Sequence, residues 1–359
     1  MSRRKWTGRF VYLFYLVVVS MAFFELGGRF IWVTDGEYLY PRSQQIFVFD
    51  RNLNYRIRAD FSIAGEENRL YPGVGLRINQ GHMRGVEPDA RDTIIIVGDS
   101  VVFGFGVRES DTMSVCLEKH LGHGLQVLNA GTPGYNMEQI ALRTRELVEQ
   151  VRPRTVILLV NANDGEARYF LHHAGLTLKR FYTYPWEKDQ YPPEVELRVD
   201  PTDHWFSPRV FSVLGGEWPV RTQVVDSPPR TEKDAVRHLA YEERQLTFWN
   251  SDDPEARERT GRAMGACRSL VDDLTARGIQ VVVTRFPWSV TVLKPAVKDG
   301  LRKLWLSALK PSPGMTVIDL QPYLAEAQKR EPQFLPADGH PNAAGHDTIA
   351  HALKDGILR

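Results

Sequence analysis

The feature that most constrains the fold is a regular alternation of short apolar runs with helix-like segments, which begins near residue 92. The first run, TIIIV at 93–97, is continuous and rich in β-branched residues, as is typical of a strand buried on both faces of a parallel sheet. We expect five such strands, at residues 93–97, 125–130, 155–160, 279–286 and 315–320. Helical periodicity predicts the intervening helices, at residues 111–122, 136–151, 254–278, 291–310 and 342–358.

Strands that alternate with helices imply right-handed crossovers and a parallel sheet with helices on both faces. Residues 91–359 are therefore predicted to form an α/β domain with a three-layer, flavodoxin-like parallel sheet. Residues 165–252 break the alternation, and their many Trp, Tyr and Phe residues argue against disorder. We interpret this stretch as a folded insertion over the C-terminal edge of the sheet, where open α/β sheets bind ligands.

The N-terminal segment predicts a membrane anchor. Residues 10–24 carry no charge, and apolar residues continue past two charged positions to Trp32, long enough in total to span a bilayer. Basic residues at positions 3–5 should hold the N-terminus in the cytoplasm. We expect residues 1–32 to be a cytoplasmic stub and one transmembrane helix, residues 33–90 a juxtamembrane linker, and the rest to lie outside the cytoplasmic membrane, in the periplasm. A cleaved signal peptide and a buried soluble helix are the alternatives.

Composition excludes some classes of function. The formal net charge is +1, so no global positive field favours nucleic acid as a partner. Two cysteines, Cys116 and Cys267, cannot make a disulfide framework, and we expect buried thiols. The phosphate-loop pattern GxxxxGK[ST] is absent. The adjacent His172 and His173 are more simply surface or packing residues than metal ligands, and we expect no metal and no cofactor.

Ser100 is the candidate nucleophile. It follows the first predicted strand in the stretch Gly98-Asp99-Ser100 and precedes a helix. A serine at that point can attack a carbonyl while its own backbone N–H helps to hold the oxyanion. A Gly-rich turn without a chemical role explains the same residues.

His340 and Asp338 are the candidate base and its partner. They lie two residues apart in a loop after the last predicted strand, at the same end of the sheet as Ser100. In an extended segment this spacing points both side chains to one side, so Asp338 can orient His340 as in a Ser-His-Asp triad. The start of a helix at Pro341 explains the loop as well, and both interpretations can hold.

Other candidate residues lie at the same edge of the sheet. Gly134 allows a close backbone approach, and the Asn163 amide can donate to an oxyanion. A type II turn at Gly134 and an Asx turn at Asn163 are the alternatives. Arg285 and Trp288 follow the fourth strand and are candidate substrate contacts, with packing against the insertion as the alternative.

Together these loops resemble the SGNH (GDSL-type) hydrolase superfamily. The matching stretches are GDS at 98–100, NAGTPG at 129–134, NAND at 161–164 and DGHPNAAGH at 338–346. The stretch RINQGHMRG at 77–85 is similar to the lead-in of membrane-anchored bacterial members. Three departures are Val101, where the family often has Leu, Asn161, where the family has glycine in its GxND block, and the acid–base spacing D-x-H in place of D-x-x-H.

The resemblance implies a division of roles. Ser100 would be the nucleophile, His340 the general base and Asp338 its orienter. The oxyanion hole would consist of the Ser100 N–H, the Gly134 N–H and the Asn163 side chain. The implied function is a membrane-anchored serine esterase acting on O-acetyl or other short acyl esters, with an ester-bearing small molecule or acylated envelope or secreted glycan as substrate. A glycan O-acyltransferase with the same triad, and a non-catalytic glycan-binding or assembly protein, are the alternatives.

Overall fold

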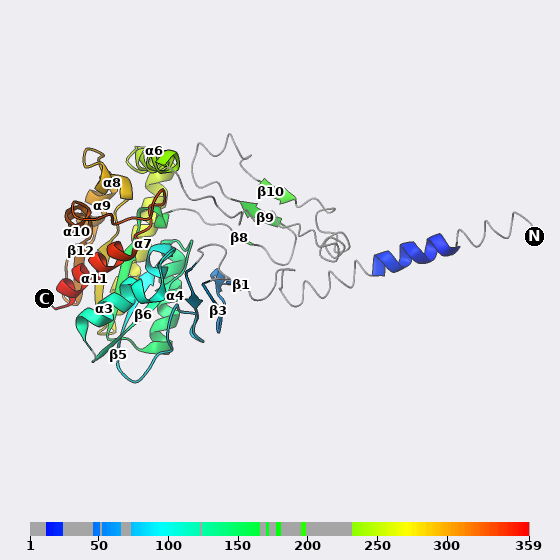
Figure 1. Cartoon of the computed structure of the whole chain (residues 1–359), viewed down its shortest axis with the longest axis horizontal. Helices are drawn as coiled ribbons and strands as arrows, with labels where there is room; N and C mark the ends of the chain where they lie inside the picture. Colours follow the sequence, from blue (N-terminus) through cyan, green and yellow to red (C-terminus); the bar gives the residue numbers. More distant parts are fainter. Residues whose placement is uncertain are drawn as a thin grey trace, which may run out of the picture. The chain divides into compact units, whose positions relative to one another are not determined.

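The computed structural model describes residues 12–23, 46–50, 52–65, 73–122, 124–165, 170–171, 177–180, 195–198 and 232–358. The chain divides into two compact units (Figure 1). The larger unit comprises Ile46–Arg168, Tyr182–Gln190 and Asp226–Arg359. Three short strands of the smaller unit form an antiparallel sheet in the order β10-β9-β8: β8 (Phe170–Leu171), β9 (Thr177–Arg180) and β10 (Val195–Arg198).

The predicted membrane anchor is only partly covered by the described residues. Residues 12–23 are helical, whereas residues 1–11 and 24–32 lie outside the described part of the chain. Within that part, no helix has the length and apolar character needed to cross a membrane.

A five-stranded parallel sheet forms the centre of the larger unit. Its strands are β5 (Asp92–Gly98), β6 (Leu125–Gly131), β7 (Thr155–Val160), β11 (Gln280–Arg285) and β12 (Met315–Asp319). Their spatial order is β12-β11-β7-β5-β6, and all four neighbouring pairs are parallel. Numbered along the chain, this is the order 2-1-3-4-5 of flavodoxin-like sheets. The predicted fold class is confirmed, and each strand lies within two residues of its predicted bounds.

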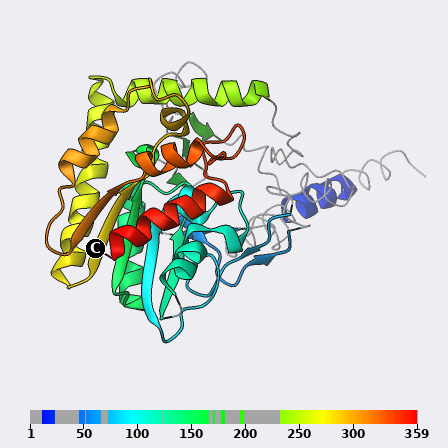
Figure 2. The same ribbon diagram turned by 60° about the vertical axis from the view of Figure 1, so that its left-hand side comes forward.

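Helices cover both faces of this sheet (Figures 1 and 2). Along β5, Ile95 and Val97 pack into one core with α4 (Met137–Val151), α7 (Pro254–Ala276) and α9 (Gly300–Ala308). Ile94 and Ile96 pack into the other core with α3 (Met113–Leu121), α10 (Gln321–Gln328) and α11 (Ala343–Ile357). Successive residues of a strand point to opposite faces, which is why a continuous apolar run serves both cores.

Two cysteines lie in these cores. Cys116 packs on the α3 side and Cys267 on the α7 side, and both are buried and free, as predicted. Burial raises the pKa of Cys267 to about 12, so that thiol stays protonated at neutral pH.

Two helical regions differ from the prediction. The single helix expected at residues 291–310 is two helices, α8 (Ser289–Leu293) and α9. Pro295 disfavours helical backbone at the residue before it, and Asp299 caps α9 by accepting a hydrogen bond from Arg302 N. The predicted insertion ends in an 18-residue helix, α6 (Glu232–Trp249), which packs against α7 and α8.

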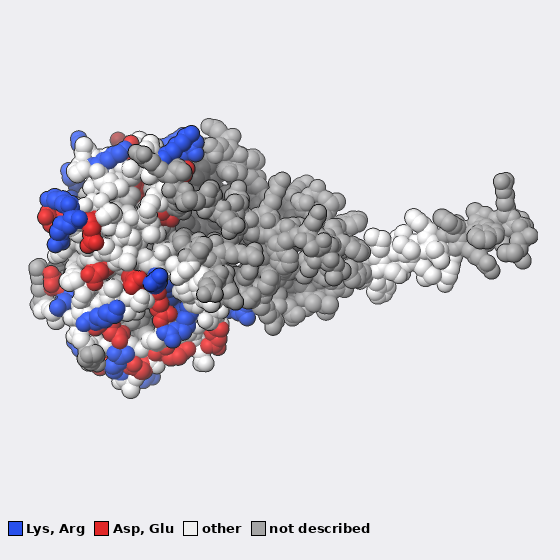
Figure 3. Space-filling model, viewed as in Figure 1, with Lys and Arg blue, Asp and Glu red and all other residues white. Residues whose placement is uncertain are grey.

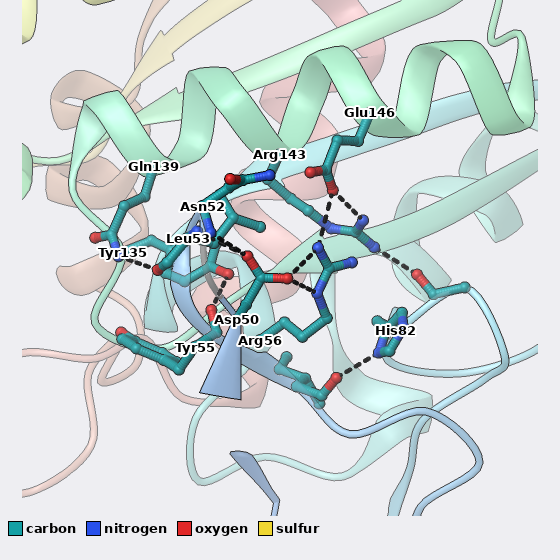
Figure 4. Close-up of polar contacts among 12 residues, drawn as sticks. Asp50, Asn52, Leu53, Tyr55, Arg56, His82, Tyr135, Gln139, Arg143 and Glu146 are labelled. Atoms are coloured by element: carbon teal, nitrogen blue, oxygen red, sulfur yellow. Dashed lines mark hydrogen bonds and ion pairs between the residues drawn. The ribbon is translucent and has the colours of Figure 1, made fainter. Parts of the chain in front are cut away.

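The described part of the predicted linker packs on the sheet domain. The hairpin of β1 (Phe47–Asp50) and β2 (Asn54–Ile57) lies beside α4 (Figure 4). Its Arg56 pairs with Asp50 and with Glu146 of α4, and the Leu53 carbonyl accepts a 2.7 Å hydrogen bond from the Gln139 amide. Leu53 itself is fully buried. Residues 46–57 are therefore part of the domain rather than a spacer.

Charges of both signs are mixed on the face of the molecule that Figure 3 shows. On the face shown in Figure 3, Lys and Arg are interspersed with Asp and Glu. This distribution agrees with the formal net charge of +1 and gives no extended positive surface on that face for nucleic acid.

Candidate active site

Ser100 is the first residue of the four-residue helix α2 (Ser100–Phe103), directly after β5. The buried Asp99 caps this helix, because one of its carboxylate oxygens accepts a 2.9 Å hydrogen bond from Val101 N. The other oxygen lies 3.5 Å from Ser100 Oγ and 3.4 Å from Asn161 Nδ2. The Gly-Asp-Ser stretch is thus a capped turn, and that turn fixes the position of the Ser100 hydroxyl.

The His340 ring lies between Ser100 and Asp338. Its Nε2 is 2.8 Å from Ser100 Oγ, and its Nδ1 is in hydrogen-bond contact with Asp338 Oδ1. A carboxylate can only accept, so Nδ1 carries the proton and Nε2 is left to accept from the Ser100 hydroxyl. The Phe105 ring packs on His340, with ring centroids 5.1 Å apart. The side chains of His340 and Asp338 are 25% and 11% exposed, so the site opens to solvent.

The loop that carries Asp338 and His340 is closed by its own backbone. Leu335 N donates to His340 O at 2.8 Å, and Asp338 N donates to Leu335 O at 3.2 Å. Ala337, directly before Asp338, has a left-handed backbone (φ 55°), which non-glycine residues adopt only at a cost. Asn342 caps α11 by accepting from Gly345 N. The helix start and the placement of the acid and base therefore coexist, and α10 intervenes between β12 and this loop.

Helix α6 contacts the same loop, which sequence reasoning did not foresee. His238 Nε2 accepts a 2.7 Å hydrogen bond from Gly339 N, between the acid and the base. A Cβ atom on Gly339 would lie 2.3 Å from Glu242 Oε1, so the close approach of α6 requires glycine there. The signal available in the sequence was the i, i+4 spacing of His238 and Glu242, which places both on one face of a helix.

Glu242 also fixes the start of α8. Its buried carboxylate accepts hydrogen bonds from Ser289 Oγ at 2.6 Å and Val290 N at 2.7 Å. The same carboxylate lies 3.3 Å from His238 Nε2. Helix α6 therefore connects two segments: His238 contacts the loop that carries Asp338 and His340, and the buried Glu242 contacts the segment after β11.

Two backbone N–H groups of the predicted oxyanion hole can donate to a ligand. Among the described residues, the N–H groups of Ser100 and Gly134 have no acceptor. Gly134 has φ 82° and forms a type II turn with Pro133, closed by Tyr135 N donating to Thr132 O. A Cβ atom at Gly134 would meet the Tyr55 hydroxyl at 2.6 Å. Turn geometry and close approach both require glycine here.

The loop after β7 carries Asn163. This residue lies in the 3₁₀ turn η3 (Ala162–Gly165), and its side chain is outside what the structure describes. Asp164 closes the turn by accepting from Asn161 N at 2.7 Å. Asn161, which stands where the family pattern has glycine, reaches Asp99 and so ties this loop to the turn before Ser100.

Arg285 and Trp288 are placed differently from the prediction that they contact substrate. Arg285 is buried and pairs with Asp299 at 2.5 Å, and burial lowers the pKa of its guanidinium. Trp288 is partly buried against the core on the α7 side of the sheet. Both side chains pack within the larger unit, and for Arg285 the partner is Asp299 in place of the insertion. Arg285 is the last residue of β11, and its side chain turns into the domain because Asp299 is there to pair with it.

Arg84, from the stretch at residues 77–85, holds the segment that follows Ser100 in the chain. Its buried guanidinium donates to the carbonyls of Phe103, Gly104 and Val107, just after α2. Burial lowers the pKa of Arg84 to about 10, so it remains charged at neutral pH. Helix α2 ends at Phe103, so these carbonyls lack the N–H donors that a longer helix would supply. The charged Arg84 side chain donates to them instead.

Comparisons with known proteins were made for the whole chain. No protein-family model matches it, and no curated protein matches it. Among solved structures, it is similar to a putative lipolytic protein of the G-D-S-L family from Desulfitobacterium hafniense, with 11% identity, a TM-score of 0.41, and 74% of this chain and 99% of that one covered. A member of the lipolytic G-D-S-L family from Veillonella parvula has 13% identity and a TM-score of 0.40, with 74% and 98% covered.

A third similar structure is a catalytic mutant of an acetylxylan esterase from Geobacillus stearothermophilus. It has 13% identity and a TM-score of 0.40, with 76% of this chain and 95% of that one covered.

Proposed function

We propose that this chain is a serine esterase of the SGNH type, with Ser100 as nucleophile, His340 as general base and Asp338 as its orienter. One observation carries the proposal: the His340 ring bonds the Ser100 hydroxyl through Nε2, at 2.8 Å, and Asp338 through Nδ1. This is the nucleophile–base–orienter arrangement of a serine hydrolase, recognised by geometry and not by sequence order.

The mechanism follows from the proton positions. Ser100 Oγ attacks the ester carbonyl as His340 Nε2 takes its proton, and Asp338 stabilises the resulting imidazolium. His340 then returns the proton to the departing alkoxide, which leaves as an alcohol and forms an acyl-enzyme. Water, deprotonated by His340, attacks the acyl group, and the proton passes back to Ser100 as the acid leaves.

The negative charge on the carbonyl oxygen needs donors at each tetrahedral stage. The N–H groups of Ser100 and Gly134 are available for this role, and we assign the third donor to the Asn163 amide. Each such donor contributes on the order of 3 kcal/mol to transition-state stabilisation in acyl-transfer enzymes.

Labelling with a fluorophosphonate probe tests the esterase directly. Wild-type protein should be labelled and should hydrolyse a short-chain aryl ester, whereas Ser100→Ala should do neither while keeping its thermal transition. Equal labelling of both proteins would remove Ser100 from the mechanism. Absence of labelling and hydrolysis in the folded wild type would leave the non-catalytic glycan-binding or assembly protein as the function.

For the substrate, we propose O-acetyl or other short acyl esters on an envelope or secreted glycan. The proposal follows from the export expected of a chain with this N-terminal segment. Acetate release from acetylated glycans, compared between wild type and Ser100→Ala, tests it. If a glycan hydroxyl takes the place of water, the same acyl-enzyme gives O-acyl transfer, and acetylated acceptor would accumulate in place of free acetate.

For the location, we propose that residues 1–32 anchor the protein in the cytoplasmic membrane with the catalytic domain in the periplasm. The uncharged stretch at residues 10–24 and the basic residues before it support this orientation. A reporter that is active only outside the cytoplasm, fused after residue 40, should be active. Activity of a cytoplasmic reporter at that junction would contradict the orientation.

A further inference from the structure

Three potential metal ligands meet on the surface between α3 and α11, two helices that pack against each other. His120 comes from the last turn of α3, and Asp347 and His351 lie one turn apart on α11. The three ligand atoms lie within 4.8 Å of one another. None of these residues takes part in the proposed reaction.

The Asp347 carboxylate lies between the two imidazoles. His120 Nε2 is 2.8 Å from Asp347 Oδ1, and His351 Nδ1 is 3.4 Å from Asp347 Oδ2. The rings are tilted by 47°, with centroids 3.9 Å apart. Atoms that bind one zinc ion tetrahedrally at about 2.0–2.2 Å lie roughly 3.3–3.6 Å apart, so side-chain rotations must bring the most separated pair closer by up to about 1.5 Å.

The chemistry of this set suits a particular class of ion. Two imidazole nitrogens and one carboxylate oxygen are ligands of Zn²⁺, and three protein ligands leave a fourth tetrahedral position for water. The side chains of His120, Asp347 and His351 are 23%, 48% and 59% exposed, so an ion can enter from solvent.

We propose that His120, Asp347 and His351 bind one Zn²⁺ ion that links α3 to α11. Without the ion, His120 Nε2 donates to the Asp347 carboxylate, and His351 Nδ1 donates to the backbone carbonyl oxygen of Asp347 at 3.0 Å. On binding, each neutral ring places its proton on its other nitrogen, Nδ1 of His120 and Nε2 of His351. The freed lone pairs and the carboxylate then bind the ion.

The link has a structural consequence. The N-terminal end of α3 already contacts α11, because Met113 N donates to His346 Nδ1 at 3.2 Å. The zinc site lies at the other end of α3 and would fix the relative position of the two helices at a second point. The three ligands come together only in the folded chain, so the ion would bind the folded state and stabilise it against unfolding. Helix α11 begins directly after the loop of Asp338 and His340, so the ion would also hold the helix next to that loop. This inference does not depend on the esterase activity.

Zinc titration of the full-length, chelator-treated protein, followed by calorimetry, tests the proposal. We expect one ion per chain and a higher thermal transition temperature with zinc. His120→Ala and His351→Ala should each weaken zinc binding about tenfold or more and abolish the thermal shift. His351 is the more exposed of the two, so its variant keeps the test valid if His120→Ala fails to fold.

Two control variants separate this site from other histidines. The double variant His172→Ala/His173→Ala and the single variant His340→Gln should keep both the stoichiometry and the thermal shift. Zinc binding of wild-type strength in His351→Ala would overturn the proposal. Loss of zinc binding in either control would overturn it as well. So would the absence of any zinc-dependent thermal shift in the wild type.

Discussion

His238 on α6 accepts a hydrogen bond from the backbone N–H of Gly339, the residue that separates the proposed acid from the proposed base. At 2.7 Å this bond connects the C-terminal part of the predicted insertion to the loop that must hold His340 against Ser100. Helix α6 therefore takes part in positioning the proposed triad.

Removal of this acceptor should slow the reaction without weakening substrate binding. For His238→Ala we expect kcat to fall by roughly fivefold to tenfold, since one net hydrogen bond is worth about 1–1.5 kcal/mol, with KM unchanged. His238→Asn, whose amide oxygen can accept, should recover part of the loss. Steady-state kinetics on an aryl ester measure both. A rise in KM at constant kcat would mean that His238 contacts substrate instead.

A methyl group at Gly339 should disrupt the same contact by steric overlap. Gly339→Ala places a Cβ atom 2.3 Å from Glu242 Oε1, and overpacking of this kind costs about 1–3 kcal/mol. We expect a lower free energy of unfolding in urea together with a lower kcat. In the double variant Gly339→Ala/Glu242→Ala the two losses should not add, because the second change removes the clashing atom. Strict additivity would contradict the contact.

Replacement of the orienting acid should act through the tautomer of His340. In Asp338→Asn the amide group can donate to Nδ1, which moves the ring proton to Nε2 and removes the acceptor for the Ser100 hydroxyl. We expect kcat to fall on the order of 10³–10⁴-fold with little change in thermal stability. Fluorophosphonate labelling should slow in parallel. A variant within tenfold of wild type would show that Asp338 does not orient the base.

Acid sensitivity should depend on His346. Burial lowers the pKa of His346 from 6.5 to about 3, and the charges of Arg84 and His340 act in the same direction. The unfolded chain therefore binds a proton that the folded chain cannot, and stability is lost as pH falls from about 6.5 towards 3. Above pH 6.5 this residue has no effect on the pH dependence.

The size of this effect can be measured between pH 7 and pH 5. The difference of 1.5 pH units below 6.5 corresponds to about 2 kcal/mol of lost stability at pH 5. His346→Asn retains an acceptor for Met113 N but does not titrate, so its free energy of unfolding should fall by about 2 kcal/mol less than that of wild type over this interval. Parallel pH profiles for the two proteins would show that His346 does not cause the slope.

The sheet was predictable because its central strands β5 and β7 are continuous apolar runs, which helices bury on both faces. Its parallel order brings the ends of β5, β6 and β7 to one edge, so Ser100, Gly134 and Asn163 were expected at neighbouring positions. Helix α6 was missed because it follows a long stretch without period. The role of Arg285 was missed because it depends on Asp299, and thus on the break between α8 and α9. No metal-binding motif is visible in the sequence for His120, Asp347 and His351. His120 lies on α3 and the other two on α11, and Asp347 follows His120 by 227 residues in the chain.

Ser100 and His340 lie far apart in the sequence. Any process that moves along the chain from its N-terminus therefore reaches the proposed nucleophile long before the proposed base. Ser100 follows the first core strand, whereas His340 comes 240 residues later, after the edge strand β12. A chain that crosses a membrane from its N-terminal side would expose the serine early and the histidine late. No partly translocated intermediate could contain a working base. If the proposed export and the proposed triad both hold, the protein would be inactive until nearly the whole domain had crossed, and its activity would be confined to the far side.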